Sequence, residues 1–264
     1  MARVIAVTNQ KGGVGKTTTC VNLAASLAAT KRRVLLVDMD PQGNATMGSG
    51  VDKNALELSG YDMLTKRASA ADVIIPAEAS GFDILPANGD LTAAEVELMN
   101  EIGREHRLRL ALNTVRDNYD YILIDCPPSL SLLTVNALSA ADSVLIPMQC
   151  EYYALEGLAA LMNTVEQIQE TVNPNLQVEG ILRTMYDPRN SLTLDVSGQL
   201  SEYFGDKVYR AVIPRNVRLA EAPSYGVPAL KYDRASKGAI AYLALAGEMV
   251  RRHGSKKTSA PVAV

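Results

Sequence analysis

The chain has 264 residues, 47% of them hydrophobic and 21% charged, and its formal net charge is −3. This composition is typical of a globular protein, and the length allows one large α/β domain or two small ones. The sequence contains no apolar run of the roughly 18 residues that a membrane-spanning helix needs, and it enters an apolar strand-like segment too early to leave room for a secretory signal peptide.

A glycine-rich segment near the N-terminus carries the clearest motif. Residues 4–8 form a short β-branched run typical of a buried strand, residues 11–18 read Lys-Gly-Gly-Val-Gly-Lys-Thr-Thr, and residues 18–29 are helix-forming. Glycines let backbone N–H groups turn toward a phosphate, and a helix N-terminus adds partial positive charge. The pattern predicts a phosphate-binding loop (P-loop) in which Lys16 reaches the β- and γ-phosphates and the Thr17 hydroxyl ligates Mg²⁺.

The P-loop departs from its common form at its first position. The standard motif would place a glycine where this chain has Gln10, and a second lysine, Lys11, precedes the glycine pair. This form resembles the deviant P-loop of the ParA/MinD family of dimerising ATPases. The resemblance implies that Lys11 crosses a dimer interface to the partner's nucleotide; the alternative is an ordinary solvated lysine. It also implies that ATP or ADP is bound by the whole loop: Lys11, Gly12, Gly13, Val14, Gly15, Lys16, Thr17 and Thr18.

Two carboxylates follow the next predicted strand, residues 33–38. The strand ends in Asp-Met-Asp-Pro-Gln-Gly-Asn at residues 38–44, and residues at the carboxyl end of such a strand face the ligand crevice of an open α/β sheet. Asp40 could simply form the turn before the following Pro-Gln-Gly. The resemblance instead implies that Asp40 orients or activates the attacking water beside the metal, with Asp38 supporting the site.

A third motif follows an apolar run at residues 121–124. It reads Asp-Cys-Pro-Pro-Ser at residues 125–129, and the two prolines prevent the strand from continuing. Asp125 at this position can hold Mg²⁺ directly or through water. A buried aspartate without a cation would be costly, which favours a metal partner. We therefore expect Thr17, Asp40 and Asp125 to surround Mg²⁺, with Lys11, Lys16, Asp40 and Asp125 forming the catalytic set.

The last predicted strand, residues 208–213, leads into Pro-Arg-Asn-Val-Arg-Leu-Ala-Glu-Ala-Pro at residues 214–223. This segment resembles the base-binding loop of the ParA/MinD family. The resemblance implies that Pro214 packs on the adenine and that Asn216 hydrogen-bonds it.

Charge is unevenly distributed along the chain. Residues 183–264 hold 13 Lys and Arg against 7 Asp and Glu, whereas residues 1–182 hold 13 against 22. A basic segment within an acidic chain points weakly to a nucleic-acid surface. Family resemblance places Arg189 and Arg218 among residues that contact the DNA backbone; the alternative is ordinary surface arginines.

Strands that alternate with helices predict the α/β fold class, with one doubly wound, mostly parallel sheet covered by helices on both faces. We expect a single ATPase domain over residues 1–253, a final helix that ends near Arg252, and a disordered tail over residues 254–264. The resemblance implies a cytoplasmic, nucleoid-associated DNA-partitioning ATPase of the ParA/Soj type. Such a protein forms an ATP-sandwich homodimer, binds double-stranded DNA without sequence preference, and hydrolyses ATP when a ParB-like activator stimulates it.

Two other functions share this type of P-loop. A MinD-like membrane-cycling ATPase needs a C-terminal amphipathic helix with large apolar residues, but residues 243–253 contain no Phe or Trp and are more simply explained by packing on the domain. An iron–sulfur reductase needs two interface cysteines. Cys20, Cys126 and Cys150 are far apart in apolar surroundings, so we expect reduced, buried thiols.

Overall fold

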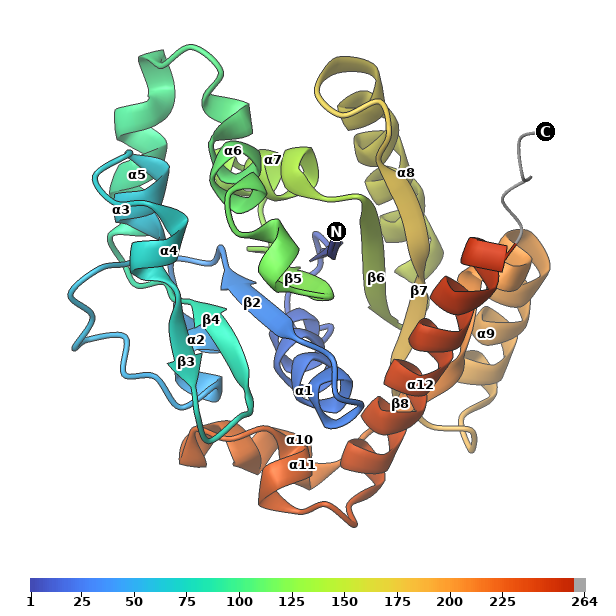
Figure 1. The fold of residues 1–264 in the computed structure, drawn as a ribbon. Helices are drawn as coiled ribbons and strands as arrows, with labels where there is room; N and C mark the ends of the chain where they lie inside the picture. The colour runs from blue at the N-terminus through green and yellow to red at the C-terminus, as the bar shows by residue number, and fades with distance from the viewer. Residues whose placement is uncertain (259–264) are drawn as a thin grey trace.

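The structure is a computed structural model and describes residues 1–258. Within these residues eight strands form one sheet, in the order β3-β4-β2-β5-β1-β6-β7-β8 (Figure 1). The strands are β1 (Arg3–Val7), β2 (Val34–Asp38), β3 (Ile75–Ala77), β4 (Phe82–Leu85), β5 (Tyr121–Asp125), β6 (Ser143–Gln149), β7 (Gln177–Tyr186) and β8 (Val208–Pro214). Every neighbouring pair is parallel except β3 with β4, which is antiparallel. The predicted fold class is confirmed.

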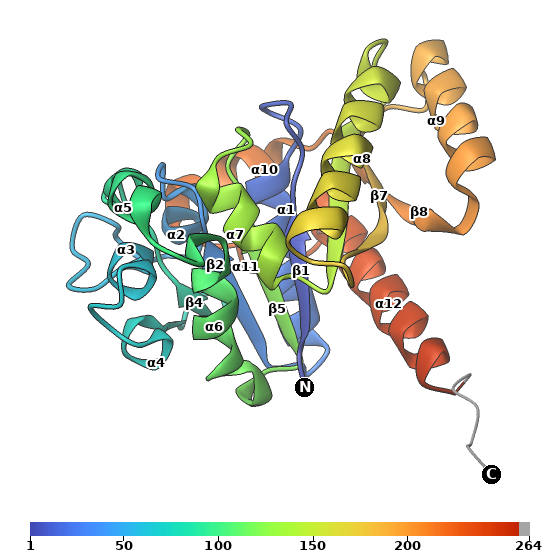
Figure 2. The same cartoon turned by 90° about the horizontal axis from the view of Figure 1, so that it is seen from above.

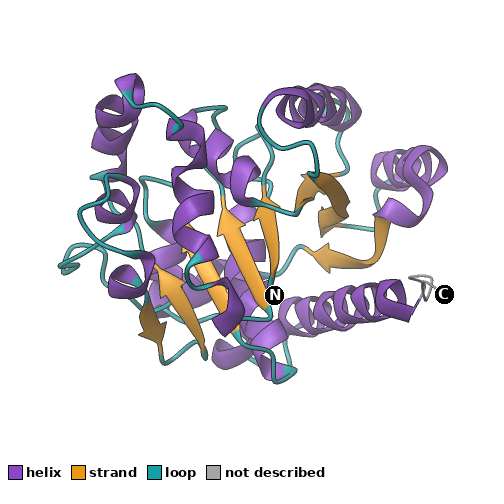
Figure 3. Ribbon diagram, turned by 45° about the horizontal axis from the view of Figure 1, so that its top comes forward, coloured by secondary structure: helices purple, strands orange, loops and turns teal. Residues whose placement is uncertain are grey.

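Helices cover both faces of the sheet (Figures 1 and 2). One face carries α3 (Gly60–Leu64), α5 (Leu91–Glu97), α6 (Arg107–Asn113), α7 (Leu132–Ala140), α8 (Ala154–Thr171) and α9 (Ser191–Phe204). The other carries α1 (Lys16–Ala29), α2 (Asn44–Gly48), α10 (Val217–Glu221), α11 (Ala229–Tyr232) and α12 (Lys237–Thr258). The remaining short helix is α4 (Ala70–Val73), and 3₁₀ turns lie at η1 (Leu98–Asn100), η2 (Arg104–His106), η3 (Arg116–Asn118), η4 (Gly205–Lys207) and η5 (Ala222–Tyr225). Figure 3 shows the same layers by type of secondary structure.

The central strands are apolar throughout because both of their faces are buried. Successive side chains of a strand point to opposite faces of the sheet. In β1, Val4 and Ala6 therefore pack in the core beneath α7 and α8, whereas Ile5 and Val7 pack in the core beneath α1 and α12. A strand that is covered on both faces cannot alternate apolar with polar residues, and this explains the continuous runs seen in the sequence.

The sheet order brings the three sequence motifs together at the carboxyl ends of neighbouring central strands. Strand β5 lies between β1 and β2, and its last residue, Asp125, is in register with Val7 and with Asp38. The P-loop leaves β1 at this end, so it lies beside the carboxylates that end the two adjacent strands. Such carboxyl edges are where open α/β sheets bind ligands.

The final helix is longer than the sequence indicated. Helix α12 continues past Arg252 to Thr258, within the tail that was predicted over residues 254–264, and residues 259–264 lie outside the described part. The residue that follows Arg252 is held by tertiary contacts. His253 is buried, with its ring Nε2 2.8 Å from Glu179 Oε1 and its Nδ1 3.0 Å from the Tyr121 hydroxyl.

Candidate nucleotide-binding site

The P-loop ends in a helix N-terminus that is open to a ligand. Gly15, the residue before α1, has φ 90° and ψ 31°, a left-handed conformation that favours glycine, and no side chain caps the helix. The N–H groups in the first turn of a helix have no partner inside the helix. Added Cβ atoms at Gly12 and Gly13 would meet nothing within 4 Å, so the loop faces open space. This is the geometry in which helix N-termini bind phosphate.

The two lysines of the loop lie in different environments. Lys16 is 8% exposed, and its Nζ lies 3.4 Å from the Lys11 carbonyl oxygen, so its ammonium group lies against the loop. The Lys11 side chain is exposed, and its Nζ forms an ion pair of 2.5 Å with Glu151 Oε2, just before α8. The Lys16 ammonium group therefore lies within the loop, whereas the Lys11 side chain lies at the surface against Glu151.

Asp125 and Thr17 are in direct contact. The Thr17 hydroxyl donates a 2.7 Å hydrogen bond to Asp125 Oδ2, and the Cys20 thiol lies 3.5 Å from Asp125 Oδ1. The Asp125 side chain is completely buried. Burial, and then the negative charge of Asp38, raise the pKa of Asp125 to about 8. The carboxylate is thus held in a site that is short of positive charge.

Asp38 and Asp40 have opposite roles in their loop. Asp38 is fully buried and accepts hydrogen bonds from the Asp40 amide, at 3.1 Å, and from the Thr46 amide and hydroxyl, each at 2.8 Å. Burial raises the pKa of Asp38 to about 6. Asp40 is half-buried, and its Oδ1 accepts one hydrogen bond, from the Gln42 amide at 2.9 Å. Asp38 thus holds the loop through three hydrogen bonds. The Asp40 carboxylate can still accept further hydrogen bonds at the edge of this loop.

The side-chain oxygens of Thr17, Asp40 and Asp125 are suitable ligands for Mg²⁺. A hydroxyl and carboxylates are the oxygen ligands that this hard cation takes, and a divalent charge would offset the burial of Asp38 and Asp125. In the described part of the chain, no three His, Cys, Asp or Glu side chains converge as a complete metal cage. Mg²⁺ suits such a site because it usually keeps several water and phosphate ligands.

A cavity of about 420 Å³ adjoins the end of the P-loop, between α1, α2 and the η5 segment. Pro214 and Asn216, the predicted base contacts, are not among its lining residues. Pro214 ends β8, and Asn216 Oδ1 caps α10 by accepting from the Arg218 amide at 3.1 Å. Sequence reasoning gave no role to the cavity walls other than Thr17 and Thr18. Asn44 ends the motif at residues 38–44 and Pro223 ends the segment that resembles a base-binding loop, whereas no motif marks Val21, Asn22, Met47, Gly48, Ser224 and Val227.

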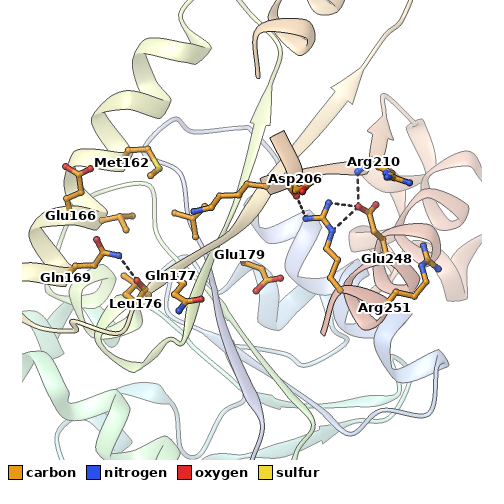
Figure 4. Close-up of a pocket in the computed structure, with 14 residues that line it drawn as sticks. Met162, Glu166, Gln169, Leu176, Gln177, Glu179, Asp206, Arg210, Glu248 and Arg251 are labelled. Atoms are coloured by element: carbon orange, nitrogen blue, oxygen red, sulfur yellow. Dashed lines mark hydrogen bonds and ion pairs between the residues drawn. The ribbon is translucent and has the colours of Figure 1, made fainter. Parts of the chain in front are cut away.

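A larger cavity, of about 920 Å³, lies away from the P-loop between α8, β7, η4 and α12 (Figure 4). Its walls carry charges of both signs, including Glu166, Lys207, Arg210 and Arg251, and none of the predicted site residues lines it. Of the predicted site residues, Thr17 and Thr18 line the smaller cavity instead.

The two arginines predicted to contact DNA are exposed but ion-paired. Arg189 Nε and Nη2 donate to the two carboxylate oxygens of Asp187, at 2.9 and 2.8 Å. Arg218 forms ion pairs with Glu221, at 2.7 Å, and with Asp233, at 3.3 Å. Both arginines lie outside the P-loop site, and intramolecular carboxylates partly neutralise their charge.

The predicted state of the cysteines is confirmed. Cys20, Cys126 and Cys150 are free and buried. Burial raises the pKa of the Cys150 thiol to about 11 and that of Cys126 further still. These thiols are therefore packed side chains rather than exposed cluster ligands.

Comparison with known proteins identifies the family. The chain matches the family model described as an AAA domain over residues 2–178. It is 56% identical to the sporulation initiation inhibitor protein Soj of Bacillus subtilis, over 94% of this chain and 98% of Soj. It is 50% identical to the chromosome partitioning protein ParA of Caulobacter vibrioides, over 98% of this chain and 97% of ParA. The chain belongs to the ParA/Soj family.

Solved structures place this ParA/Soj chain in the same fold as nucleotide-bound proteins. A Mycobacterium smegmatis protein described as cobyrinic acid a,c-diamide synthase, with bound ATP analog and magnesium, matches with a TM-score of 0.85 and 38% identity over 97% of both chains. The septum site-determining protein MinD of Pyrococcus horikoshii, complexed with Mg-ADP, matches with a TM-score of 0.78 and 27% identity over 97% of this chain and 99% of MinD. The ParA/MinD resemblance inferred from the three motifs is confirmed.

Proposed function

We propose that this protein is a dimerising ATPase of the DNA-partitioning type, which binds ATP with Mg²⁺ and hydrolyses it to ADP and phosphate. The observation that carries the proposal is the 2.7 Å hydrogen bond from the Thr17 hydroxyl to Asp125. It joins the end of the P-loop to the carboxylate of an adjacent strand, where a nucleotide-bound Mg²⁺ needs oxygen ligands. The ATP analog and magnesium in the Mycobacterium smegmatis neighbour support the same ligands here.

Each residue of the site then has a distinct task. Thr17 and Asp125 would hold Mg²⁺, whose charge would stabilise the negative charge on the phosphates. Lys16 and the amide groups of residues 12–18 bind and orient the triphosphate. Asp40, at the edge of the metal site, accepts a hydrogen bond from the attacking water and fixes its direction. The cavity beside Thr18 takes the nucleoside, and Pro214 and Asn216 close on the base from the neighbouring loop.

Dimerisation is the second part of the proposal. Two triphosphates that face one another repel, and a lysine donated from each partner offsets that charge. The exposed Lys11 side chain, whose ammonium group forms a surface ion pair with Glu151, supports this role. Tyr152 and Tyr153, just before α8, are 76% and 71% exposed, and apolar side chains so exposed near the P-loop suit a partner surface.

DNA binding and release complete the proposed cycle. The ATP dimer binds double-stranded DNA through its backbone, without sequence preference, using Arg189 and Arg218. A ParB-like protein stimulates hydrolysis, and the dimer then separates and leaves the DNA. The name of Caulobacter vibrioides ParA, at 50% identity, supports a partitioning role.

The names of the structural neighbours suggest two other outputs. A MinD-like membrane cycle needs a free apolar helix face, but Tyr242, Leu245 and Met249 of α12 are at most 1% exposed because they pack in the core. No helix in the described part of the chain is long and apolar enough to cross a bilayer. Cobyrinic acid amidation carries less weight, since that neighbour is 38% identical, below both partitioning-type relatives.

Gel filtration with ATP, with ADP and without nucleotide, each with and without DNA, tests the proposal. We expect a dimer with ATP alone, and a DNA complex only when ATP is present. Lys16→Ala removes the positive charge that contacts the phosphates. This variant should bind neither ATP nor ADP productively. Undiminished ATP affinity in that variant would falsify the P-loop assignment. Co-sedimentation with anionic vesicles instead of DNA would favour the MinD-like cycle.

A further inference from the structure

The P-loop backbone is tied to two neighbouring strands, through the side chain of Asn9 within the loop and the side chain of Thr184 on β7. At the start of the loop, Asn9 Nδ2 donates to the Pro147 carbonyl of β6, and Asn9 Oδ1 accepts from the Lys11 amide, both at 2.9 Å. At its end, the Thr184 hydroxyl of β7 donates to the Val14 carbonyl at 2.8 Å. Thr184 is 3% exposed and Val14 1% exposed, so this second contact is shielded from water.

The Thr184 contact sets the direction of one peptide group. In a trans peptide unit the carbonyl and the following N–H point in opposite directions. Because the Val14 carbonyl is directed at Thr184, inside the protein, the Gly15 N–H is directed away from β7. Within the described residues, no carbonyl or side chain accepts a hydrogen bond from this N–H. A buried or ligand-facing amide without a protein acceptor is ready to bind an anion.

The glycine-rich sequence of the loop restricts its backbone little, so the loop needs a restraint from outside. Gly13 and Gly15 both have positive φ, at 75° and 90°, and glycine is the residue with the most backbone freedom to lose on ordering. Among the described residues, none lies within 4 Å of the position of a Cβ added at Gly12 or Gly13. At Gly15, the methyl group of Thr184 lies 3.9 Å from the position of an added Cβ, so threonine supplies both a packing contact and a donor.

We propose that Thr184 is a positioning residue for phosphate binding: its hydroxyl holds the peptide between Val14 and Gly15 so that the Gly15 N–H faces the phosphates. This inference rests on the proposed nucleotide binding and names a residue that lies outside all three motifs, 170 positions from its partner. Lys16 supplies charge, whereas Thr184 supplies orientation. Loss of Thr184 therefore weakens the nucleotide complex without abolishing it.

Thr184→Val tests the hydroxyl at nearly constant shape. Valine retains the β-branched packing in β7 but leaves the Val14 carbonyl without its donor. Thr184→Ser retains the donor and removes the methyl group. Ser80→Ala is the matched control, because the buried Ser80 hydroxyl also donates to a backbone carbonyl, that of Ser49 at 2.9 Å, in a turn away from the P-loop.

Affinity for Mg-ATP and Mg-ADP is measured by calorimetry, and folding by thermal unfolding. For Thr184→Val we expect both nucleotides to bind about tenfold more weakly, with a matching rise in KM and little change in kcat at saturating ATP. Thr184→Ser and Ser80→Ala should bind nucleotide within about twofold of the wild type. A folded Thr184→Val with wild-type affinity overturns the inference. So does equal weakening by Ser80→Ala, which would indicate general destabilisation.

The Lys16→Ala variant separates this inference from the proposed function. If the wild type binds ATP, Lys16→Ala does not, and Thr184→Val binds normally, only the role of Thr184 is wrong. If the wild type fails to bind ATP with Mg²⁺, the proposed function fails first.

Discussion

The Lys11 ammonium group lies 2.5 Å from Glu151 Oε2 of the same chain, and both side chains are about half exposed, at 48% and 49%. An ion pair exposed to this degree stabilises a protein by about 0.2–1 kcal/mol. Such a pair holds Lys11 in a defined place. Because the pair is weak, Lys11 can exchange Glu151 for a partner of higher charge, such as a triphosphate across an interface.

We predict that Lys11→Gln binds ATP but remains a monomer, because the charge that offsets two facing triphosphates is lost. Gel filtration with ATP measures this. Lys31→Gln, which removes an exposed lysine at the far end of α1, is the matched control and should dimerise normally. A Lys11→Gln dimer of wild-type strength would contradict the crossing-lysine hypothesis.

Glu151→Gln releases Lys11 from its own chain. We expect ATP-dependent dimerisation to strengthen by no more than about 30-fold, since a dimer releases two such surface pairs and each contributes at most about 1 kcal/mol. Analytical ultracentrifugation across a range of protein concentrations measures the dimer constant. Weaker dimerisation in Glu151→Gln would mean that Glu151 itself contacts the partner.

Asp38 and Asp40 should separate into a structural and a catalytic aspartate. Asp40→Ala should bind ATP, lose turnover and accumulate as the ATP dimer, because Asp40 holds only one backbone amide of its own loop. Asp38→Ala should lower the free energy of unfolding, because each buried donor left unpaired costs about 1–3 kcal/mol and Asp38 holds three. Phosphate release and urea unfolding measure the two effects. Normal turnover in Asp40→Ala would place the attacking water elsewhere.

The sequence predicted those features that depend on local pattern. Apolar runs marked the central strands, and glycines, lysines and strand-ending aspartates marked the P-loop and Asp125. Features that depend on tertiary contact were missed. Strand β3 has three residues, one of them Pro76, and exists only by pairing with β4. His253 of α12 lies 2.8 Å from Glu179, 74 residues away in the sequence, and Thr184 shows no pattern that links it to Val14.

The buried Glu179 predicts a stability change in acid. Burial alone would raise its pKa, but hydrogen bonds from His253 of α12, Ser143 of β6 and Tyr209 of β8 outweigh it and lower the pKa from 4.5 to about 2. A carboxyl group whose pKa is lowered by folding stabilises the fold at pH values above its ordinary pKa. That contribution is lost as the pH falls through the pKa of the folded state. We therefore predict that the free energy of unfolding falls between pH 4.5 and about 2.

Urea unfolding across this pH range measures the change. Glu179→Gln should be less stable at neutral pH and show a flatter acid dependence, whereas Glu170→Gln, at an exposed position on α8, should follow the wild type. An acid dependence in Glu179→Gln as steep as in the wild type would assign the effect to other carboxyl groups.

The DNA surface gives the last prediction. Asp187 holds the Arg189 guanidinium through two hydrogen bonds, and Glu221 and Asp233 hold Arg218, so each arginine must share its charge with carboxylates before it meets a phosphate. Arg189→Ala and Arg218→Ala should each weaken DNA binding by the ATP dimer and leave dimerisation intact. Asp187→Asn should strengthen DNA binding, because it frees Arg189.

The salt dependence of binding distinguishes phosphate contacts from a change of fold. The logarithm of affinity falls with the logarithm of salt at a slope of about −0.9 per phosphate neutralised, and a dimer doubles the contacts of each arginine. Removing one arginine should therefore reduce the slope by about 1.8. Arg67→Ala, at an exposed arginine paired with Glu97 beside α3, is the control and should change neither slope nor affinity. Wild-type DNA affinity in the Arg189/Arg218 double variant at moderate salt would exclude this surface, and an unchanged affinity in Asp187→Asn would mean that Arg189 is not limited by its ion pair.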